Sequence, residues 1–214
     1  VLHGKAQNIS KHSQCHDPLS SDERTRLNSF RSHSAATEFL AGRIVIKSFL
    51  ARWLACKPHE IAVTATPHEK PKLLREATLN LNAAPEFNLS HSGGYIALAI
   101  HLNKPIGIDI ELSPVSEPRS HYDVEQLFTP EEIRHLTKAP NPMEESKRFL
   151  ILWRAKEAIM KATGLGFSLS PATFTVFEPC GMLSKRVFAN ERSWRLERLN
   201  LTSSVEAACA WEDG

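Results

Sequence analysis

The sequence predicts an α+β protein built from two similar halves, residues 1–105 and 106–214. A helical pattern followed by short apolar strands occurs in each half. Tight turns separate the strands, and such a grouping of helices and strands is typical of antiparallel α+β folds. A length of 214 residues is enough for two small domains.

In the first half, residues 34–54 carry apolar side chains at helical spacing, and Pro58 lies just beyond, where helices commonly end. The turn at 103–105 leads us to expect a hairpin between the two strands around it. The segments expected after the helix are a strand at 61–64, a loop at 67–74, a strand at 86–89, a turn at 90–94 and strands at 95–102 and 106–111.

In the second half, Thr129 is a predicted helix cap, followed by proline and two acids in the first turn. A second helix is expected at 144–163, ending at Gly164. The strands expected after it are 173–177, 186–188, 194–199 and 205–211.

Composition excludes some classes of function. Apolar residues make up 42% of the chain, as in ordinary globular proteins. The net charge of +2 is too small to indicate a nucleic-acid partner, so a local basic cluster must meet any anionic ligand. No apolar run approaches the roughly 18 residues of a membrane span. We therefore expect neither a nucleic-acid nor a membrane partner.

The polar segment 1–20 is expected to be a flexible tail without a signal sequence. His12, Cys15 and His16 could bind a metal, but no second ligand pair lies nearby, which favours the tail. The cysteines form no CxxC pair, so we expect free thiols and a cytoplasmic protein.

Residues 106–111 (IGIDIE) alternate strictly between apolar and other residues. In a strand, the isoleucines would face the core, and Gly107, Asp109 and Glu111 would share the other face. Two carboxylates beside a residue without a side chain leave space for a ligand, and hard oxygen ligands suit Mg²⁺ with a phosphate. The alternative is an ordinary strand with solvated acids.

Trp153, Glu157 and Lys161 share one stripe of the second helix, with Lys156 at its edge. The helix is apolar nearly all round, and buried charges need partners. Glu157 could be a third metal carboxylate, and Lys161 could neutralise a phosphate. A surface ion pair is the alternative.

The turn at 90–94 (SHSGG) could hold an anion with its backbone amides. A nucleophilic serine with His91 as base is disfavoured, because no strained elbow motif is present. A simple turn remains possible. Arg43 and Lys47 share a helix face and, with Lys70, could form a phosphate cluster or remain scattered solvated charges.

Three motifs together resemble the Sfp-type 4′-phosphopantetheinyl transferases: 87–92 (FNLSHS), 106–111 (IGIDIE) and 153–161 (WRAKEAIMK). Lys70 with the proline after it fits the family's Gly-Lys-Pro loop, although Glu69 replaces the glycine. The resemblance covers about residues 37–169.

The resemblance implies a pseudo-dimer of two α+β halves with coenzyme A in the cleft between them. Such a pseudo-dimer has less need of a partner, so we expect a monomer. By the same resemblance, Asp109, Glu111 and Glu157 would bind Mg²⁺ together with the pyrophosphate of coenzyme A.

Five residues would contact coenzyme A by resemblance. His91 and Lys70 would meet its phosphates, and Ser90 would meet the nucleotide region. Arg43 and Lys161 would supply further positive charge.

The implied reaction transfers 4′-phosphopantetheine to a serine of an acyl or peptidyl carrier protein, with Glu157 as general base and Lys161 and Lys156 assisting. The sequence leaves open whether Glu157 is base, metal ligand or both, and which carrier and pathway are served. A Mg²⁺-dependent nucleotide pyrophosphatase and a non-catalytic module that binds coenzyme A or a carrier are the alternatives.

The segment 113–139 is a candidate docking surface for the carrier. The alternative is that its apolar residues pack the Thr129 helix on the core. Its proposed contacts are Leu127, Phe128, Ile133 and Leu136, with Arg119, Arg134 and Lys138 as charge partners.

Overall fold

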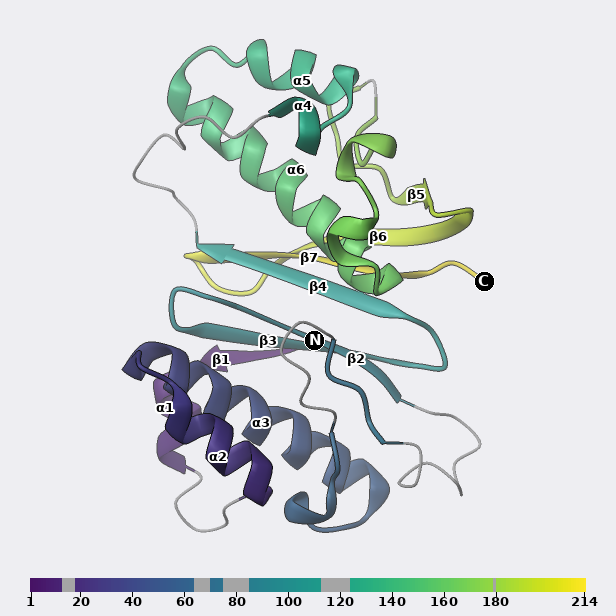
Figure 1. The fold of residues 1–214 in the computed structure, drawn as a ribbon. Helices are drawn as coiled ribbons and strands as arrows, with labels where there is room; N and C mark the ends of the chain where they lie inside the picture. The colour runs from purple at the N-terminus through teal and green to yellow at the C-terminus, as the bar shows by residue number, and fades with distance from the viewer. Residues whose placement is uncertain (13–17, 64–69, 75–84, 113–123, 179) are drawn as a thin grey trace. The chain divides into compact units, whose positions relative to one another are not determined.

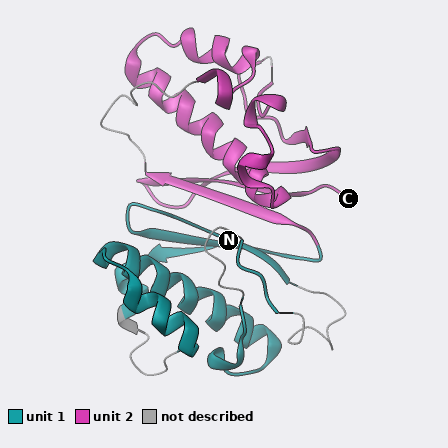
Figure 2. Ribbon diagram, in the orientation of Figure 1, with its two compact units in different colours: residues 1–103 teal, residues 104–214 magenta. Residues whose placement is uncertain are grey.

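The computed structural model describes residues 1–12, 18–63, 70–74, 85–112, 124–178 and 180–214. It divides into two compact units, Val1–Asn103 and Lys104–Gly214 (Figure 2). Each unit contains helices and an antiparallel sheet, which confirms the predicted α+β class with two halves.

Two sequence expectations, on membrane-spanning helices and on the state of the cysteines, can be compared with the structure. No helix in the described ranges combines the length and the apolar character that crossing a bilayer requires. The three described cysteines, Cys56, Cys180 and Cys209, are free thiols, as expected.

Unit 1 contains a three-stranded sheet in the order β1-β3-β2 (Figure 1). Helix α3 packs on strand β3, and Ile46 and Leu50 of the helix join Phe87 and Leu98 in one buried cluster. Ser32 caps the helix with its side chain, as the polar residue before an apolar pattern commonly does. The elements of this unit are β1 (Leu2–Lys5), α1 (Ala6–His12), α2 (Ser21–Ser29), α3 (His33–Leu54), the 3₁₀ turn η2 (Pro58–Glu60), β2 (Pro85–Ser92) and β3 (Tyr95–Leu102).

The expectation of a flexible tail at residues 1–20 is wrong for most of that segment. Strand β1 pairs antiparallel with β3, and α1 follows it. Its side chains are mostly exposed, so no apolar pattern marks it, and the backbone hydrogen bonds to β3 define the strand. The possible metal ligands His12, Cys15 and His16 lie outside the described side chains.

The expected turn at 90–94 is shorter than predicted. Ser90, His91 and Ser92 continue strand β2 and pair with β3. The turn consists of Gly93 and Gly94 alone, both with positive φ (55° and 77°), as the favoured two-residue hairpin turns require. His91 and its neighbours are therefore strand residues whose side chains alternate between the two faces of the sheet.

The expected hairpin between residues 95–102 and 106–111 is wrong. Strand β3 pairs with β1 and β2, whereas β4 (Ile106–Leu112) pairs with β7 (Val205–Glu212) in a separate sheet. A strand has two edges, and its own side-chain pattern does not select the partner.

Unit 2 contains a four-stranded sheet in the order β4-β7-β6-β5, with α6 packed on β4 and β7 (Figure 1). The predicted helix start at Thr129 is confirmed, since Thr129 forms a capping box with Glu132. Helix α6 begins at Pro142, two residues before the predicted start, and Asn141 caps it. Gly164 ends α6 in the left-handed conformation, as predicted. The elements are β4, α4 (Val124–Leu127), α5 (Pro130–Thr137), α6 (Pro142–Thr163), the 3₁₀ turns η4 (Gly166–Ser168) and η5 (Pro171–Thr173), β5 (Arg186–Ala189), β6 (Arg192–Asn200) and β7.

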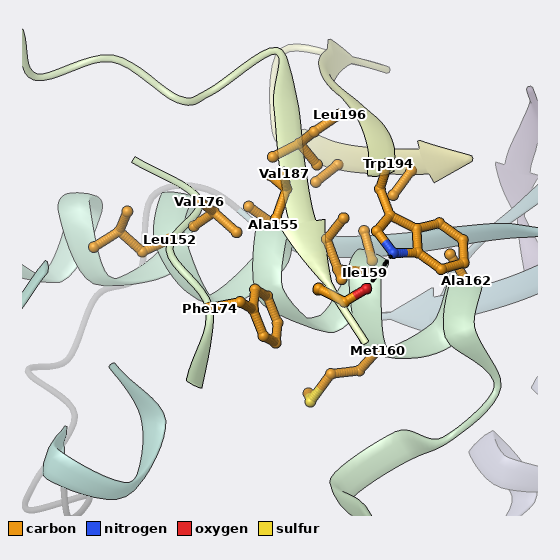
Figure 3. Packing of buried hydrophobic residues seen from close by; sticks show 14 of the residues in the cluster. Leu152, Ala155, Ile159, Met160, Ala162, Phe174, Val176, Val187, Trp194 and Leu196 are labelled. Carbon is orange, nitrogen blue, oxygen red and sulfur yellow. Dashed lines mark hydrogen bonds between the residues drawn. The ribbon is translucent and has the colours of Figure 1, made fainter. Parts of the chain in front are cut away.

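The core of unit 2 lies between α6 and the sheet (Figure 3). Ala155 and Ile159 from the helix meet Val187 and Trp194 from the strands, and all four are buried. The indole Nε1 of Trp194 donates a hydrogen bond to the carbonyl of Ala189 at 2.9 Å, so its polar atom is satisfied inside the core.

Two short predicted strands do not form. In the described part of 61–74, only the bridge between Val63 and Leu73 is present. The segment at 173–177 begins as η5 and makes a single bridge, although Phe174 and Val176 are buried in alternation as in a strand. Its backbone groups are shared between two kinds of partner: the nitrogen of Val176 donates to the side chain of Glu132, and the carbonyl of Val176 accepts from the nitrogen of Ser184 at 2.9 Å.

Gly107 on β4 is a point of close approach to α6. A Cβ atom there would lie 2.1 Å from the carbonyl oxygen of Ala158 and 2.3 Å from the amide nitrogen of Ala162. The space beside Asp109 that we expected for a ligand is therefore filled by the backbone of α6, and the glycine lets the helix lie against the strand.

We expect Gly107→Ala to lower the free energy of unfolding by about 1–3 kcal/mol or more, because the helix must move away from the sheet. The measurement is denaturant unfolding. Gly4→Ala on β1 is the control, because a Cβ there would meet only the flexible Ile9 side chain at an ordinary 3.4 Å. Equal effects of the two substitutions would contradict the close-packing argument.

Candidate active site

Strand β4 and helix α6 bring predicted site residues together in unit 2. The alternation along β4 turns Asp109 and Glu111 to the same face as Gly107, toward α6. The Nζ atom of Lys161 lies 2.6 Å from Oδ1 of Asp109 and 4.0 Å from Oε2 of Glu157. Lys161 thus links a carboxylate of the strand to one on its own helix.

Glu157 lies in a partly desolvated, strongly charged environment. Burial raises the pKa of its carboxyl group, Lys161 opposes that rise, and the negative charges of Asp109 and Glu111 add to it. All three predicted carboxylates therefore lie within electrostatic range of one another. A raised pKa makes Glu157 a stronger base than an exposed glutamate.

The donor set is compatible with a hard cation. Asp109, Glu111 and Glu157 offer carboxylate oxygens, and Mg²⁺ usually takes only one or two protein carboxylates besides substrate phosphates and water. Within the described residues, no group of three or more His, Cys, Asp or Glu side chains is arranged to hold a metal ion. The metal site stays a prediction that depends on a phosphate ligand.

Lys156 lies in the core of unit 2, away from this cluster. Its side chain has no exposed surface, and Nζ lies 2.6 Å from Oε2 of Glu132. It also donates hydrogen bonds to the backbone carbonyls of Pro171 and Phe174. A group so enclosed does not reach a leaving group, so we assign Lys156 a structural role in place of the predicted catalytic one.

Glu132 completes the same buried network. Its carboxylate accepts hydrogen bonds from the backbone nitrogens of Thr129 and Val176, both at 2.9 Å. Together with Lys156, it satisfies backbone groups of the segment after α6 that would otherwise need a partner strand. The network thus takes up part of the backbone hydrogen bonding of residues 173–177, where no regular strand forms.

Unit 1 contains a pocket of about 290 Å³ beside α3. It combines basic, aromatic and apolar side chains. Its lining residues are Arg26, Phe30, Ala35, Glu38, Phe39, Gly42, Arg43, Ile46, Pro71, Leu89 and His91.

Two guanidinium groups of the pocket lie over one aromatic ring. Cζ of Arg26 is 5.3 Å and Cζ of Arg43 is 5.2 Å from the centroid of Phe39. Nε of Arg43 lies 3.4 Å from Oε1 of Glu23, while burial lowers the pKa of the guanidinium. This arrangement holds the arginines in place beside the pocket.

Some of the residues predicted to bind coenzyme A line this pocket, and others do not. Arg43 and His91 line it, and Nδ1 of His91 lies 3.2 Å from a carboxylate oxygen of Glu38. Lys70 precedes the lining residue Pro71, and its Nζ is 3.8 Å from Glu86.

Ser90 does not line the pocket. It is 4% exposed, and its side chain points to the face of β2 opposite that of His91 because neighbouring strand residues alternate. The predicted contact of Ser90 with the nucleotide region would therefore have to be made from the face of β2 opposite that of His91.

Arg26 and Glu38 were missed by the sequence reasoning. Arg26 lies on α2, in a segment for which no element was expected. A signal was present: Ser20 and Glu23 form a capping box, in which the serine side chain accepts from the Glu23 nitrogen and Glu23 accepts from the Ser20 nitrogen. A serine followed three residues later by glutamate marks a helix start.

The four apolar residues proposed as contacts of the candidate docking surface at 113–139 are internal, whereas Arg134 and Lys138 are exposed. Phe128 and Leu136 are buried in the core of unit 2, at 1% and 3% exposure, and Leu127 and Ile133 pack against that core. Arg119 lies outside the described residues. The interpretation of these apolar residues as core is therefore the one that the structure supports.

Comparison with known protein families covers nearly the whole chain with two models. Residues 7–103 match the model described as 4′-phosphopantetheinyl transferase, N-terminal, and residues 105–210 match the 4′-phosphopantetheinyl transferase superfamily model. The boundary between the two matches coincides with that between the two units.

Individual relatives carry the same description. The chain is 34% identical to the 4′-phosphopantetheinyl transferase HetI of Nostoc over 70% of its own length and 61% of the relative. It is 31% identical to a 4′-phosphopantetheinyl transferase of Bacillus subtilis, over 74% of the chain and 66% of the relative. For a phosphopantetheinyl transferase of Thraustochytrium, the identity is 31% and the coverage 77% and 59%.

The chain spans about three fifths of the length of the curated relatives it matches first. Both units are nevertheless matched by models of one family, and Lys161 of α6 forms an ion pair with Asp109 of β4. The chain belongs to the 4′-phosphopantetheinyl transferase superfamily.

Proposed function

We propose that this protein transfers the 4′-phosphopantetheine group of coenzyme A to a serine of an apo acyl or peptidyl carrier protein. Adenosine 3′,5′-bisphosphate is the second product. The observation that carries the proposal is the cluster on β4 and α6, in which Lys161 bridges Asp109 and a Glu157 whose pKa is raised.

Unit 1 supplies recognition of the nucleotide part of coenzyme A in this proposal. Arg26, Arg43 and His91 suit phosphate groups, and the rings of Phe30 and Phe39 suit an aromatic base. Ligand pockets commonly measure about 300–1,000 Å³, so a pocket of about 290 Å³ takes only part of coenzyme A.

Unit 2 supplies the reacting groups. The carrier serine Oγ attacks the β-phosphorus of coenzyme A, and the bond from that phosphorus to the oxygen of the leaving bisphosphate breaks. Glu157 accepts the serine proton, and the ammonium of Lys161 stabilises the negative charge on the phosphoryl oxygens. Asp109 and Glu111, together with Glu157, would hold Mg²⁺, which supplies Lewis-acid polarisation of the phosphoryl oxygens when bound.

The test is to incubate the protein with coenzyme A, Mg²⁺ and several apo-carriers and to follow carrier mass. Transfer appears as a gain of one phosphopantetheine group together with release of adenosine 3′,5′-bisphosphate. Free phosphopantetheine formed without carrier would show a pyrophosphatase. Binding of coenzyme A without either product would show a non-catalytic module.

We expect Arg26→Met and Arg43→Met each to weaken binding of coenzyme A by about tenfold, because each removes a charged donor next to an anion. Calorimetry without carrier measures the dissociation constant. Arg31→Met is the matched control, since Arg31 is exposed and does not line the pocket. If all three variants bind coenzyme A equally, the pocket of unit 1 is not the nucleotide site.

A further inference from the structure

A fourth carboxylate, Glu206, lies next to the carboxylate cluster of unit 2. Strands β4 and β7 pair so that Glu111 is directly opposite Glu206. Directly paired residues point to the same face with Cβ atoms about 4.5–5.5 Å apart, and like charges there destabilise the sheet. The face that carries Asp109 and Glu111 therefore carries a third acid from the neighbouring strand.

Two arginines hold this fourth carboxylate. Nη2 of Arg154, on α6, donates to Oε2 of Glu206 at 2.5 Å. Nη2 of Arg198, on β6, donates to both oxygens of Glu206 at 2.9 and 3.0 Å. Glu206 is thus drawn into an ion-pair network of its own, although it lies opposite Glu111.

Arg154 is an unusual residue for a buried helix face. It is 2% exposed, and burial lowers the pKa of its guanidinium, while Glu206 and then Asp109 oppose that shift by attraction. Its Nη1 atom is buried with no hydrogen-bond partner among the described residues. A buried donor left unused in this way calls for an explanation other than packing.

The charge balance of the cluster is a second, independent observation about Arg154. The acids are Asp109, Glu111, Glu157 and Glu206. Among the described residues, Lys161 pairs with Asp109 and Glu157, and Arg154 and Arg198 pair with Glu206. Without Arg154, only the more exposed Arg198 would hold Glu206 within the described ranges, and less of the negative charge beside Glu111 would be balanced. The site would then attract cations more strongly and repel phosphates.

We propose that Arg154 is a positioning residue that neutralises Glu206 and keeps it from joining Asp109 and Glu111 as a ligand of the divalent cation. This inference rests on the proposed function and extends it to two residues outside the predicted site. Arg154 acts through the carboxylates and needs no contact with the substrate.

We expect the Arg154→Met and Glu206→Gln variants to change the affinity for Mn²⁺ in opposite directions. In Arg154→Met, we expect Mn²⁺, the probe for the divalent cation, to bind about fivefold more tightly and coenzyme A about fivefold more weakly, because one nearby positive charge is lost. In Glu206→Gln, Arg154 is released toward the other carboxylates, so Mn²⁺ should bind about fivefold more weakly. The double variant should return to within about twofold of wild type, since the two changes compensate.

The measurements are Mn²⁺ titrations followed by electron paramagnetic resonance, without and with saturating coenzyme A, and calorimetry of coenzyme A. All are made below the unfolding temperature of each variant. Arg192→Met is the matched control, because Arg192 pairs with Glu212 on the same sheet but is exposed. We expect it to leave both affinities unchanged.

A purely structural pair gives a different pattern. Both single variants would then lower stability and shift Mn²⁺ affinity in the same direction or not at all, and that result overturns the proposal. If the wild type binds Mn²⁺ neither without nor with saturating coenzyme A, both the metal site and this inference are overturned. A wild type that binds Mn²⁺ and shows the opposite shifts in its variants, yet modifies no carrier, overturns only the proposed function.

Discussion

Glu157→Gln should lower kcat by about 10²–10⁴-fold, the usual contribution of a general base, while the dissociation constant of coenzyme A changes little. The amide has the shape of the carboxylate but does not accept the serine proton. Since burial disfavours the carboxylate charge, the variant should unfold at the temperature of the wild type or above it. Single-turnover kinetics and calorimetry on the same preparation separate the two effects.

Glu145→Gln is the matched control for this experiment. Glu145 lies on the same helix, in its exposed first turn, and its loss should leave kcat unchanged. A Glu157→Gln variant that keeps kcat but no longer binds coenzyme A would show that Glu157 anchors the ligand and is not the base.

Lys156→Met should lower the free energy of unfolding by about 3–5 kcal/mol, because removing one partner leaves a buried charge uncompensated. Glu132 is fully buried and would keep its negative charge or take up a proton at a cost in free energy. The carbonyls of Pro171 and Phe174 would also lose their donor. Urea unfolding at neutral pH measures the effect.

Lys147→Met provides the comparison on the same helix. Lys147 is half exposed and lies 3.8 Å from Glu144, and such surface pairs contribute about 0–1 kcal/mol. If the two variants lose equal stability, the network of Lys156 is not a structural element. If Lys156→Met keeps its stability but loses kcat, the catalytic role first predicted for Lys156 is restored.

Local sequence signals were sufficient for the long elements of both units. Helices α3 and α6 follow from their apolar patterns, and their ends follow from the residues next to them, such as Pro58 after α3 and Gly164 after α6. The alternation in β4 correctly turns Asp109 and Glu111 to one face. Spacing along the strand and the helix predicted which side chains share a face, whereas the roles of the carboxylates and lysines came from the family resemblance and stay predictions.

Only the tertiary structure decided which partners the side chains and strands contact. Lys156 and Lys161 lie on one helix with similar neighbours, but the helix turns one into the core toward Glu132 and the other toward Asp109. The partner of β4, the contact of Gly107 with α6 and the approach of Arg26 to Arg43 depend on residues far apart in the chain. Hydrophobic periodicity determines which side of an element is buried, whereas which partner buries it depends on long-range packing and pairing that no local pattern records.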